Sequence, residues 1–245
     1  MSDPILKLGT IMGVWAHPDD ESFMVGGILS MAAAAGQTVV CVTATKGELG
    51  IQDESKWPAA TLAETRTHEL ETALDILGIQ YHHWLGYNDG KCADVDETEA
   101  IDQIVQLIEQ YKPDTIITFP PDGVTGHPDH QAVSRWAQKA AKQSTHPPEV
   151  YFAVQTQEAY DAFLHVMDEQ FNVYFATDNP VFIPQDECDI HIALQPEVAD
   201  RKAQALKAQS SQFSAMFDFL GFKGVEFALG TEALVHSKHD QFWAK

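Results

Sequence analysis

The first two-thirds of the chain alternates short apolar runs with segments whose apolar residues recur every three or four positions. The apolar runs predict strands at 10–16, 38–45, 81–85, 115–119 and 150–154, of which the first two are expected to be buried and the third to be short. The periodic segments predict helices marked by these positions: Met24, Ile28, Met31 and Ala35; Leu70, Ala73, Leu74 and Leu77; Ile101, Ile104, Val105 and Ile108; Val133, Trp136, Ala137 and Ala140. Such alternation predicts a mostly parallel sheet with helices on both faces.

Residues 155–245 follow a less regular pattern. It predicts strands at 172–176 and 189–194 and a helix from Pro196 to about Gln209, before the apolar segment 225–230. No linker-like or repeated segment separates this part from the rest. We therefore expect one α/β domain over 1–245, with a Rossmann-like, doubly wound core at 1–154 and a C-terminal extension.

Composition indicates a globular protein with a strongly acidic surface. Of the 245 residues, 44% are hydrophobic, and 15 Lys and Arg against 36 Asp and Glu give a formal net charge of −21. Such a surface repels phosphate, so neither nucleic acid nor an anionic membrane is an expected partner. The N-terminus does not resemble a secretory signal, and the three cysteines form no CxxC pair. We therefore expect a cytoplasmic protein with reduced thiols.

Ionisable residues follow two of the predicted strands directly. "AHPDDE" (16–21) follows the first strand, and "GHPDH" (126–130) follows the fourth. A single His-Pro-Asp after a strand is usually a turn with a helix cap. In a doubly wound sheet of strand order 3-2-1-4-5, however, the first and fourth strands are neighbours, and the loops at their carboxyl ends form the ligand-binding crevice. Two copies at these places favour one shared site.

His17, Asp20 and His130 make a set of two imidazoles and one carboxylate. Catalytic zinc accepts such a set and keeps a fourth position for water, whose pKa it lowers to about 7. Side chains of adjacent turn residues point in different directions, so we expect Asp19 to act as a base rather than as a ligand. Asp129 is expected to orient a histidine. The histidines expected to be structural or at the surface are His68, His82, His83, His146, His165, His191, His236 and His239.

These segments resemble the PIG-L/LmbE-like N-acetylglucosaminyl deacetylases, zinc hydrolases that remove acetyl from an amino sugar. The resemblance covers most of the N-terminal two-thirds. It extends to "TKGELG" (45–50), "RTHE" (66–69) with "LG" (77–78), and "NDG" (88–90). The paired His-Pro-Asp motifs are highly specific, and the other segments are supportive only.

The resemblance implies that one Zn²⁺ per chain is bound by His17, Asp20 and His130. It implies that Asp19 is the general base, and that His127 stabilises the oxyanion or acts as an acid. It also implies that chains of this kind often form homo-oligomers, without fixing the number of copies.

The resemblance further implies that Arg66 and Asp89 contact the sugar. The residues alone leave simpler interpretations open: Arg66 could pair with Glu69 on a solvated helix face, and Asp89 could cap its own turn. The chain departs from the family pattern at two positions. Thr125 stands at a substrate-binding position where some amidases of the family carry tyrosine, and Gln209 stands where the family's C-terminal helix carries histidine. We expect both departures to affect substrate recognition more than hydrolysis.

We therefore predict a zinc-dependent N-deacetylase whose partner is a small N-acetylglucosamine-type amino sugar or its conjugate. An amidase of a sugar–thiol conjugate, of the mycothiol or bacillithiol type, would use the same ligands and is the main alternative. A phosphoesterase usually needs two metals, and the sequence shows ligands for one. A non-catalytic sugar-binding protein would need a broken base or ligand set, and this set is intact.

Overall fold

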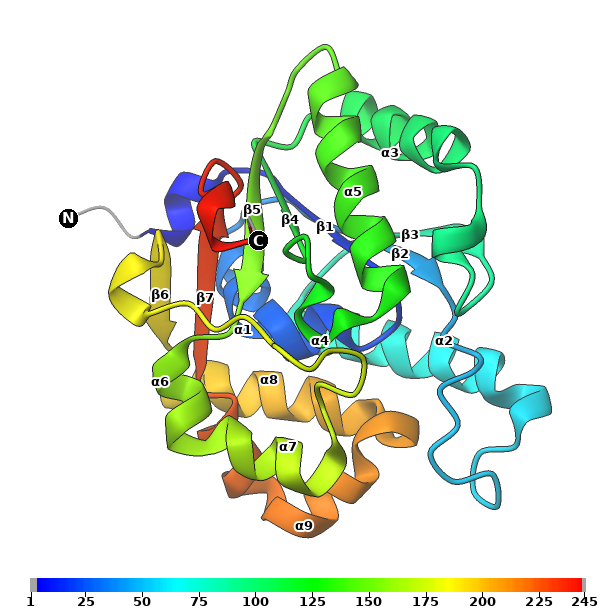
Figure 1. Cartoon of the computed structure of the whole chain (residues 1–245), viewed down its shortest axis with the longest axis vertical. Helices are drawn as coiled ribbons and strands as arrows, with labels where there is room; N and C mark the ends of the chain where they lie inside the picture. Colours follow the sequence, from blue (N-terminus) through cyan, green and yellow to red (C-terminus); the bar gives the residue numbers. More distant parts are fainter. Residues whose placement is uncertain (1–3, 244–245) are drawn as a thin grey trace.

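The computed structural model describes residues 4–243, and its strands form one seven-stranded sheet (Figure 1). The strands are β1 (Ile11–Trp15), β2 (Val39–Thr45), β3 (Tyr81–Tyr87), β4 (Thr115–Thr118), β5 (Glu149–Val154), β6 (Ile190–Ala193) and β7 (Thr231–His236). Their order is β3-β2-β1-β4-β5-β7-β6. The first five run parallel, which confirms the predicted order, and β7 is antiparallel to both β5 and β6.

The helices cover both faces of this sheet. They are α1 (Asp20–Ala34), α2 (Ala59–Leu77), α3 (Glu97–Tyr111), α4 (Gly123–Gly126), α5 (Pro128–Gln143), α6 (Gln157–Ala159), α7 (His165–Phe171), α8 (Pro196–Ala208) and α9 (Ser210–Ala228). Right-handed crossovers put α1 and α2 on one face and α3 and α5 on the other, because the strand order reverses direction after β3. Helix α8 packs over α1 and α2, and α9 packs against α8.

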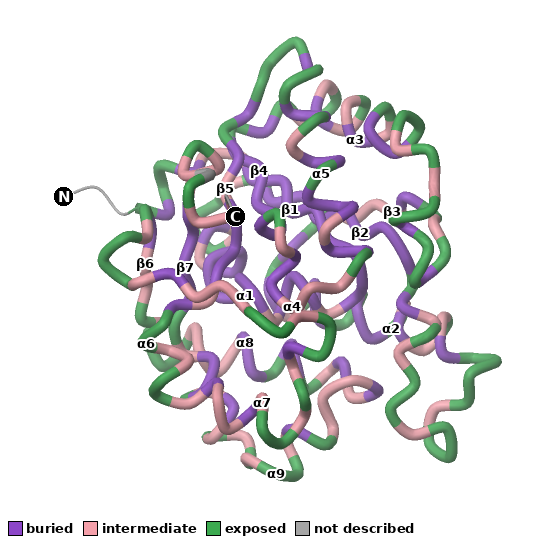
Figure 2. The backbone as a smooth tube through the Cα atoms, in the orientation of Figure 1, coloured by how far each residue is buried: buried purple, intermediate pink, exposed green. Residues whose placement is uncertain are grey.

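The core lies between the sheet and the innermost helices. Every residue of β1 and β2 is buried (Figure 2). Helix α1 is buried on several sides, because it lies between the sheet and α8; Ile28 and Leu29 are both fully buried. Helix α2 ends where predicted, at Gly78, whose φ of 80° is in the left-handed region that glycine tolerates.

The predicted strand at 172–176 is wrong. Asn172 ends α7 with a left-handed φ of 51°, and the chain then turns. Its apolar residues serve a loop instead: Tyr174 is buried, while Val173 and Phe175 line a cavity. The strand β7 and the long helix α9 were not predicted, and the segment 225–230 forms the end of α9 and the turn into β7.

Within residues 4–243, no helix combines the length and the apolar character that crossing a membrane requires.

Candidate active site

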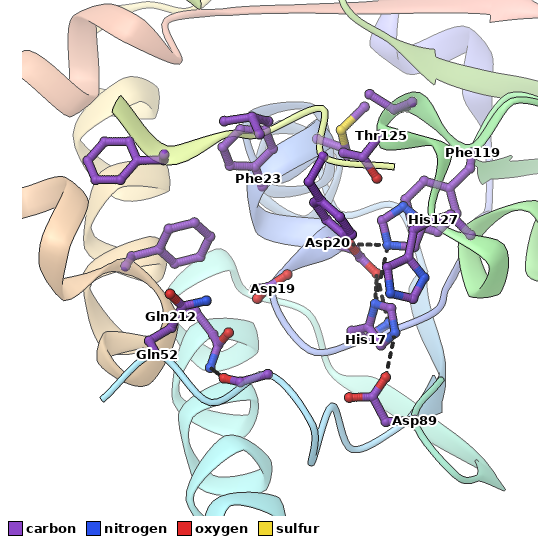
Figure 3. A pocket seen from close by; sticks show the side chains of 18 of the residues that line it. His17, Asp19, Asp20, Phe23, Gln52, Asp89, Phe119, Thr125, His127 and Gln212 are labelled. Atoms are coloured by element: carbon purple, nitrogen blue, oxygen red, sulfur yellow. Dashed lines mark hydrogen bonds and ion pairs between the residues drawn. The ribbon is translucent and has the colours of Figure 1, made fainter. Parts of the chain in front are cut away.

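The two His-Pro-Asp segments meet at the carboxyl ends of β1 and β4, which pair side by side. Nε2 of His130 lies 3.2 Å from Nδ1 of His17, a residue 113 positions away, and 3.4 Å from Oδ1 of Asp20. Nδ1 of His17 lies 3.6 Å from Oδ2 of Asp20. Figure 3 shows His17, Asp20 and His127 gathered at one end of a cavity. Potential donor atoms of all three residues therefore lie close together.

The spacing of these three donors fits a single metal ion. Tetrahedral zinc, with bonds of about 2.0–2.1 Å to nitrogen and oxygen, separates neighbouring ligand atoms by about 3.3 Å. The two ring nitrogens are 3.2 Å apart, and each lies near a different oxygen of Asp20: Nε2 of His130 is 3.4 Å from Oδ1, and Nδ1 of His17 is 3.6 Å from Oδ2. Their side chains are 9–11% exposed, so the point of convergence is sheltered but reachable from the cavity. These residues could hold one divalent cation.

Two other groups among the described residues bring potential ligand atoms within 4.8 Å of one another: His17 with His127 and His130, and His17 with Asp89 and Asp129. In the second group both carboxylates face Nε2 of His17, at 3.0 Å from Asp89 and 3.4 Å from Asp129, whereas Nδ1 faces His130. The carboxylates of Asp89 and Asp129 are therefore placed to accept a hydrogen bond from the Nε2–H of His17. Such a hydrogen bond fixes the tautomer and the orientation of the His17 ring.

Both carboxylates behind His17 are held by the backbone. Asp129 is fully buried and accepts the N–H groups of Gly90, at 2.7 Å, and Cys92, at 3.0 Å. Burial by itself lowers the pKa of His17, but the hydrogen bonds to Asp129 and Asp89 raise it to about 10. The site thus strongly favours positive charge at this ring. His130 is oriented in the same way, because its Nδ1 lies 3.0 Å from the carbonyl oxygen of Gly123 and its Nε2 is left for the convergence point.

Asp19 has a different position from its neighbour Asp20. Its φ of 99° is rare for a residue with a side chain, and such strain is concentrated at functional sites. The turn is stabilised by the Asp19 N–H, which donates to Oε2 of Glu21 at 3.1 Å. Burial, with the nearby charges of Asp20 and Glu21, raises the pKa of Asp19 to about 8 against the lowering effect of Arg66. The side chain is 19% exposed and lines the cavity.

Arg66 is buried and contacts Asp19 instead of the solvent. Its Nη2 donates to Oδ2 of Asp19 at 2.8 Å and to the carbonyl of Pro18 at 2.6 Å, and its Nη1 donates to the carbonyl of Gly47 at 2.7 Å. The alternative pairing with Glu69 is wrong: Glu69 accepts the N–H of Ser211 at 2.8 Å. Asp89 likewise does not cap its own turn, since it contacts His17 and accepts the N–H of Leu49.

His127 precedes α5 and has one ring nitrogen free for the cavity. Its Nδ1 accepts the N–H of Asp129 at 3.1 Å, so the neutral ring carries its proton on Nε2. The ring centroid lies 4.9 Å from that of His17 and 5.0 Å from that of His130. The preceding turn is strained, because Val124 has a φ of 64°. His127 can therefore present an N–H donor beside the convergence point.

The cavity has a volume of about 490 Å³ and two chemically different ends. The end described above is lined by histidines and carboxylates, and the other wall is lined by phenylalanines from α1, α7, α9 and the loop after α7. Thr125 lines the cavity, and its buried Oγ1 has no hydrogen-bond partner among residues 4–243. Gln209 lies outside the lining: its side-chain amide donates to Glu21 at 3.1 Å and Ser22 at 3.0 Å.

Sequence reasoning did not assign a role to Glu21 or to the phenylalanine wall. Glu21 belongs to the quoted "AHPDDE" segment, and its place in the first turn of a helix beside two other carboxylates was a usable signal. The aromatic residues Phe171, Phe175 and Phe213 carried no such signal, because they come from a part of the chain whose elements were only partly predicted.

The chain is similar in sequence to proteins that are named as deacetylases. The enzyme 1D-myo-inositol 2-acetamido-2-deoxy-alpha-D-glucopyranoside deacetylase of Kineococcus radiotolerans is 36% identical over 151 residues, which are 50% of this chain and 42% of that protein. The protein of the same name from Rhodococcus erythropolis is 27% identical over 256 residues, covering 90% of this chain and 85% of the relative.

Solved structures show the same fold. N,N'-diacetylchitobiose deacetylase from Pyrococcus horikoshii superposes with a TM-score of 0.66 at 20% identity, covering 96% of this chain and 86% of that one. A 4-carboxy-2-hydroxymuconate hydratase from Pseudomonas putida also shares the fold, with a TM-score of 0.59 at 16% identity and coverage of 94% and 96%. The fold alone therefore does not fix the reaction. The family model described as GlcNAc-PI de-N-acetylase (PIG-L) matches residues 12–141, just over half of the chain, and the chain belongs to that family.

Proposed function

We propose that the chain is a metal-dependent N-deacetylase of an N-acetylated amino sugar or its conjugate. The observation that carries the proposal is the convergence of His17, Asp20 and His130 donors at 3.2–3.6 Å, with the Asp19 carboxylate beside them in one cavity. The names of the relatives support the substrate class, because the two relatives described above are named as deacetylases of an acetamido sugar joined to inositol. Zinc, one ion per chain, is the metal we propose for this donor set.

The reaction follows from what each side chain can do. A divalent metal held by His17, Asp20 and His130 would supply Lewis-acid polarisation of the amide carbonyl and of the attacking water. The Asp19 carboxylate accepts the proton of that water as it attacks. The Nε2–H of His127 donates to the carbonyl oxygen as negative charge develops there. Asp19 or His127 then returns a proton to the departing amine, which gives acetate and a free amino sugar.

We propose supporting roles for the other residues that the sequence singled out. We assign to Arg66 the positioning of Asp19, because its guanidinium contacts that carboxylate and the two loops beside it. We assign to Asp89 and Asp129 the orientation of His17. Thr125 is the proposed substrate contact, because its Oγ1 faces the cavity region without a partner among the described residues.

A substrate screen tests the proposal. Purified, zinc-loaded protein is incubated with N-acetylglucosamine, its inositol conjugate and sugar–thiol conjugates, and the released amine is measured. We expect hydrolysis of at least one N-acetylated sugar. Cleavage of sugar–thiol conjugates alone would favour the amidase alternative, and release from none of them at full metal content would refute the proposal.

The cytoplasmic location and a homo-oligomeric state stay predictions of the sequence. Nucleic acid is not a proposed partner, because the formal net charge of −21 opposes it.

A further inference from the structure

Four phenylalanine side chains form an apolar wall of the cavity. Phe23 from α1, Phe171 from the end of α7, Phe175 from the following loop and Phe213 from α9 all line it. The rings of Phe23 and Phe213 are parallel, with an interplanar angle of 1° and centroids 6.1 Å apart. In the view of Figure 3, Phe23 lies on the far side of Asp20 from Asp89.

This wall extends to the rim of the cavity and into solvent. Phe175 is 59% exposed and Leu49, from the loop after β2, is 65% exposed, although both line the cavity. Exposed apolar side chains at the mouth of a cavity indicate a surface that is covered when a ligand binds. Phe175 also connects this rim to the reaction centre, because its ring packs edge-on against His127 with centroids 5.9 Å apart.

Three of the polar side chains that line the cavity are engaged in contacts within the protein. The Arg66 guanidinium and the Asp89 carboxylate are committed to contacts within the protein. The amide of Gln212 donates to the carbonyl of Gly50 at 2.9 Å. Gln52, Thr125 and Asn172 also line the cavity and can meet a sugar, while Phe23, Phe171, Phe175 and Phe213 add aromatic surface that a sugar alone does not need.

We propose that the preferred substrate is an amphiphilic amino sugar that carries, besides the amide, an apolar group long enough to lie along Phe23, Phe171, Phe213 and Phe175. This inference rests on the proposed N-deacylase function and narrows its substrate. The apolar group belongs either to the acyl chain that is removed or to the aglycone, and both would meet the same wall. Each methylene buried there should raise kcat/KM by about two- to fourfold.

Two series of substrates distinguish an apolar group on the acyl chain from one on the aglycone. One series lengthens the acyl group on glucosamine from acetyl through butanoyl and hexanoyl to octanoyl. The other keeps N-acetyl and lengthens the glycosidic group from methyl through butyl to octyl. We expect kcat/KM to rise along at least one series, and that series identifies the group. Equal or falling values along both would overturn the inference while leaving the deacetylase proposal standing, whereas hydrolysis of no member would refute both.

Alanine variants of the phenylalanines test which of them contact the apolar group of the substrate. Phe171→Ala, Phe213→Ala and Phe175→Ala should flatten the dependence of kcat/KM on chain length. Phe227→Ala is the matched control, because Phe227 lies on the same helix as Phe213, is 72% exposed and does not line the cavity. Since Phe175 is on an exposed loop, its replacement tests the wall even if the helical variants fail to fold. An unchanged chain-length dependence in Phe175→Ala would contradict the assignment.

Discussion

Arg66 reaches from α2 to Asp19, and its Nη2 lies 2.8 Å from Oδ2 of that carboxylate. The same guanidinium donates to the carbonyls of Pro18 and Gly47. These acceptors belong to the loop after β1 and the loop after β2, so one side chain fixes both loops around the cavity. The position of the proposed base therefore depends on a residue that need not touch the substrate.

Arg66→Ala is expected to lower kcat by about 10²-fold, with a smaller change in KM, because Asp19 loses the contact that fixes its direction. The free energy of unfolding should fall by about 1–3 kcal/mol, since buried carbonyls lose their donor. Steady-state kinetics and urea unfolding measure both effects. Arg135→Ala is the control, because the Arg135 side chain is 48% exposed and lies 3.9 Å from Glu97. A rise in KM with unchanged kcat would instead identify Arg66 as a direct substrate contact.

His130→Ala should lower metal affinity steeply, because one of three converging donors is removed. His127→Ala should retain the metal and lose activity, since its Nδ1 is occupied by the Asp129 N–H and it acts through Nε2. Metal content after dialysis against a mild chelator distinguishes the two variants. Equal metal loss in both variants would mean that His127 is a ligand. The test is needed because ligand atoms of His127, His17 and His130 lie within 4.8 Å of one another.

Asp129→Asn should weaken metal binding by about 10- to 100-fold, because His17 loses a fixed hydrogen-bond partner. Asp129 itself is not proposed as a ligand. Competition with a fluorescent chelator measures the affinity. Asp94→Asn, at a side chain that is 68% exposed, is the matched control and should bind the metal normally. Unchanged affinity in the Asp129 variant would show that this carboxylate does not support the site.

The strand–helix alternation was sufficient to predict β1 to β5 and their order. β1, β2, β4 and β5 are mostly buried in the parallel sheet, so they appear as continuous apolar runs, whereas β3 at the edge of the sheet is mostly part-exposed. The sequence did not predict that β7 would insert between β5 and β6, because antiparallel pairing with a distant strand leaves no local signature. The error at 172–176 also comes from tertiary structure: the apolar run there supplies the contacts of a loop and not those of a strand.

The same distinction applies to the site. The convergence of the two His-Pro-Asp segments could be predicted, because strand order fixes which loops meet. The direction in which a carboxylate on a loop points could not be predicted. Asp89 was expected at the sugar, yet its Oδ1 lies 3.0 Å from Nε2 of His17, since the loop after β3 folds back over the end of β1. Arg66 was expected either to contact the substrate or to lie on a solvated helix face. It is buried against Asp19 because the loops that carry Pro18 and Gly47 fold around it.

Glu232→Ala should be strongly destabilising. This carboxylate of β7 is almost fully buried, accepts the N–H groups of Gly27 and Ile28 at 2.7 Å each, and pairs with Lys202 at 2.7 Å. Its removal leaves a buried ammonium unpaired, which costs about 3–5 kcal/mol in unfolding free energy.

Urea unfolding of Glu232→Ala is best compared with that of Lys91→Ala. The pair that Lys91 forms with Asp94 is exposed, with side chains 60% and 68% exposed, and such pairs contribute about 0–1 kcal/mol. Similar losses in the two variants would show that the Glu232 contacts do not stabilise α1.

Asp19→Asn separates the proposed base from its neighbour Asp20. Asparagine is nearly isosteric but is no useful base at neutral pH, so the variant should bind the metal normally while kcat falls by about 10²–10⁴-fold. Asp20→Asn should instead lose metal and recover part of its activity in excess zinc. The decisive experiment measures amine release and bound metal together in wild type and Asp19→Asn. Full metal content with the expected loss of rate supports a metal-dependent hydrolase whose base is Asp19; full metal content with undiminished amine release would contradict it.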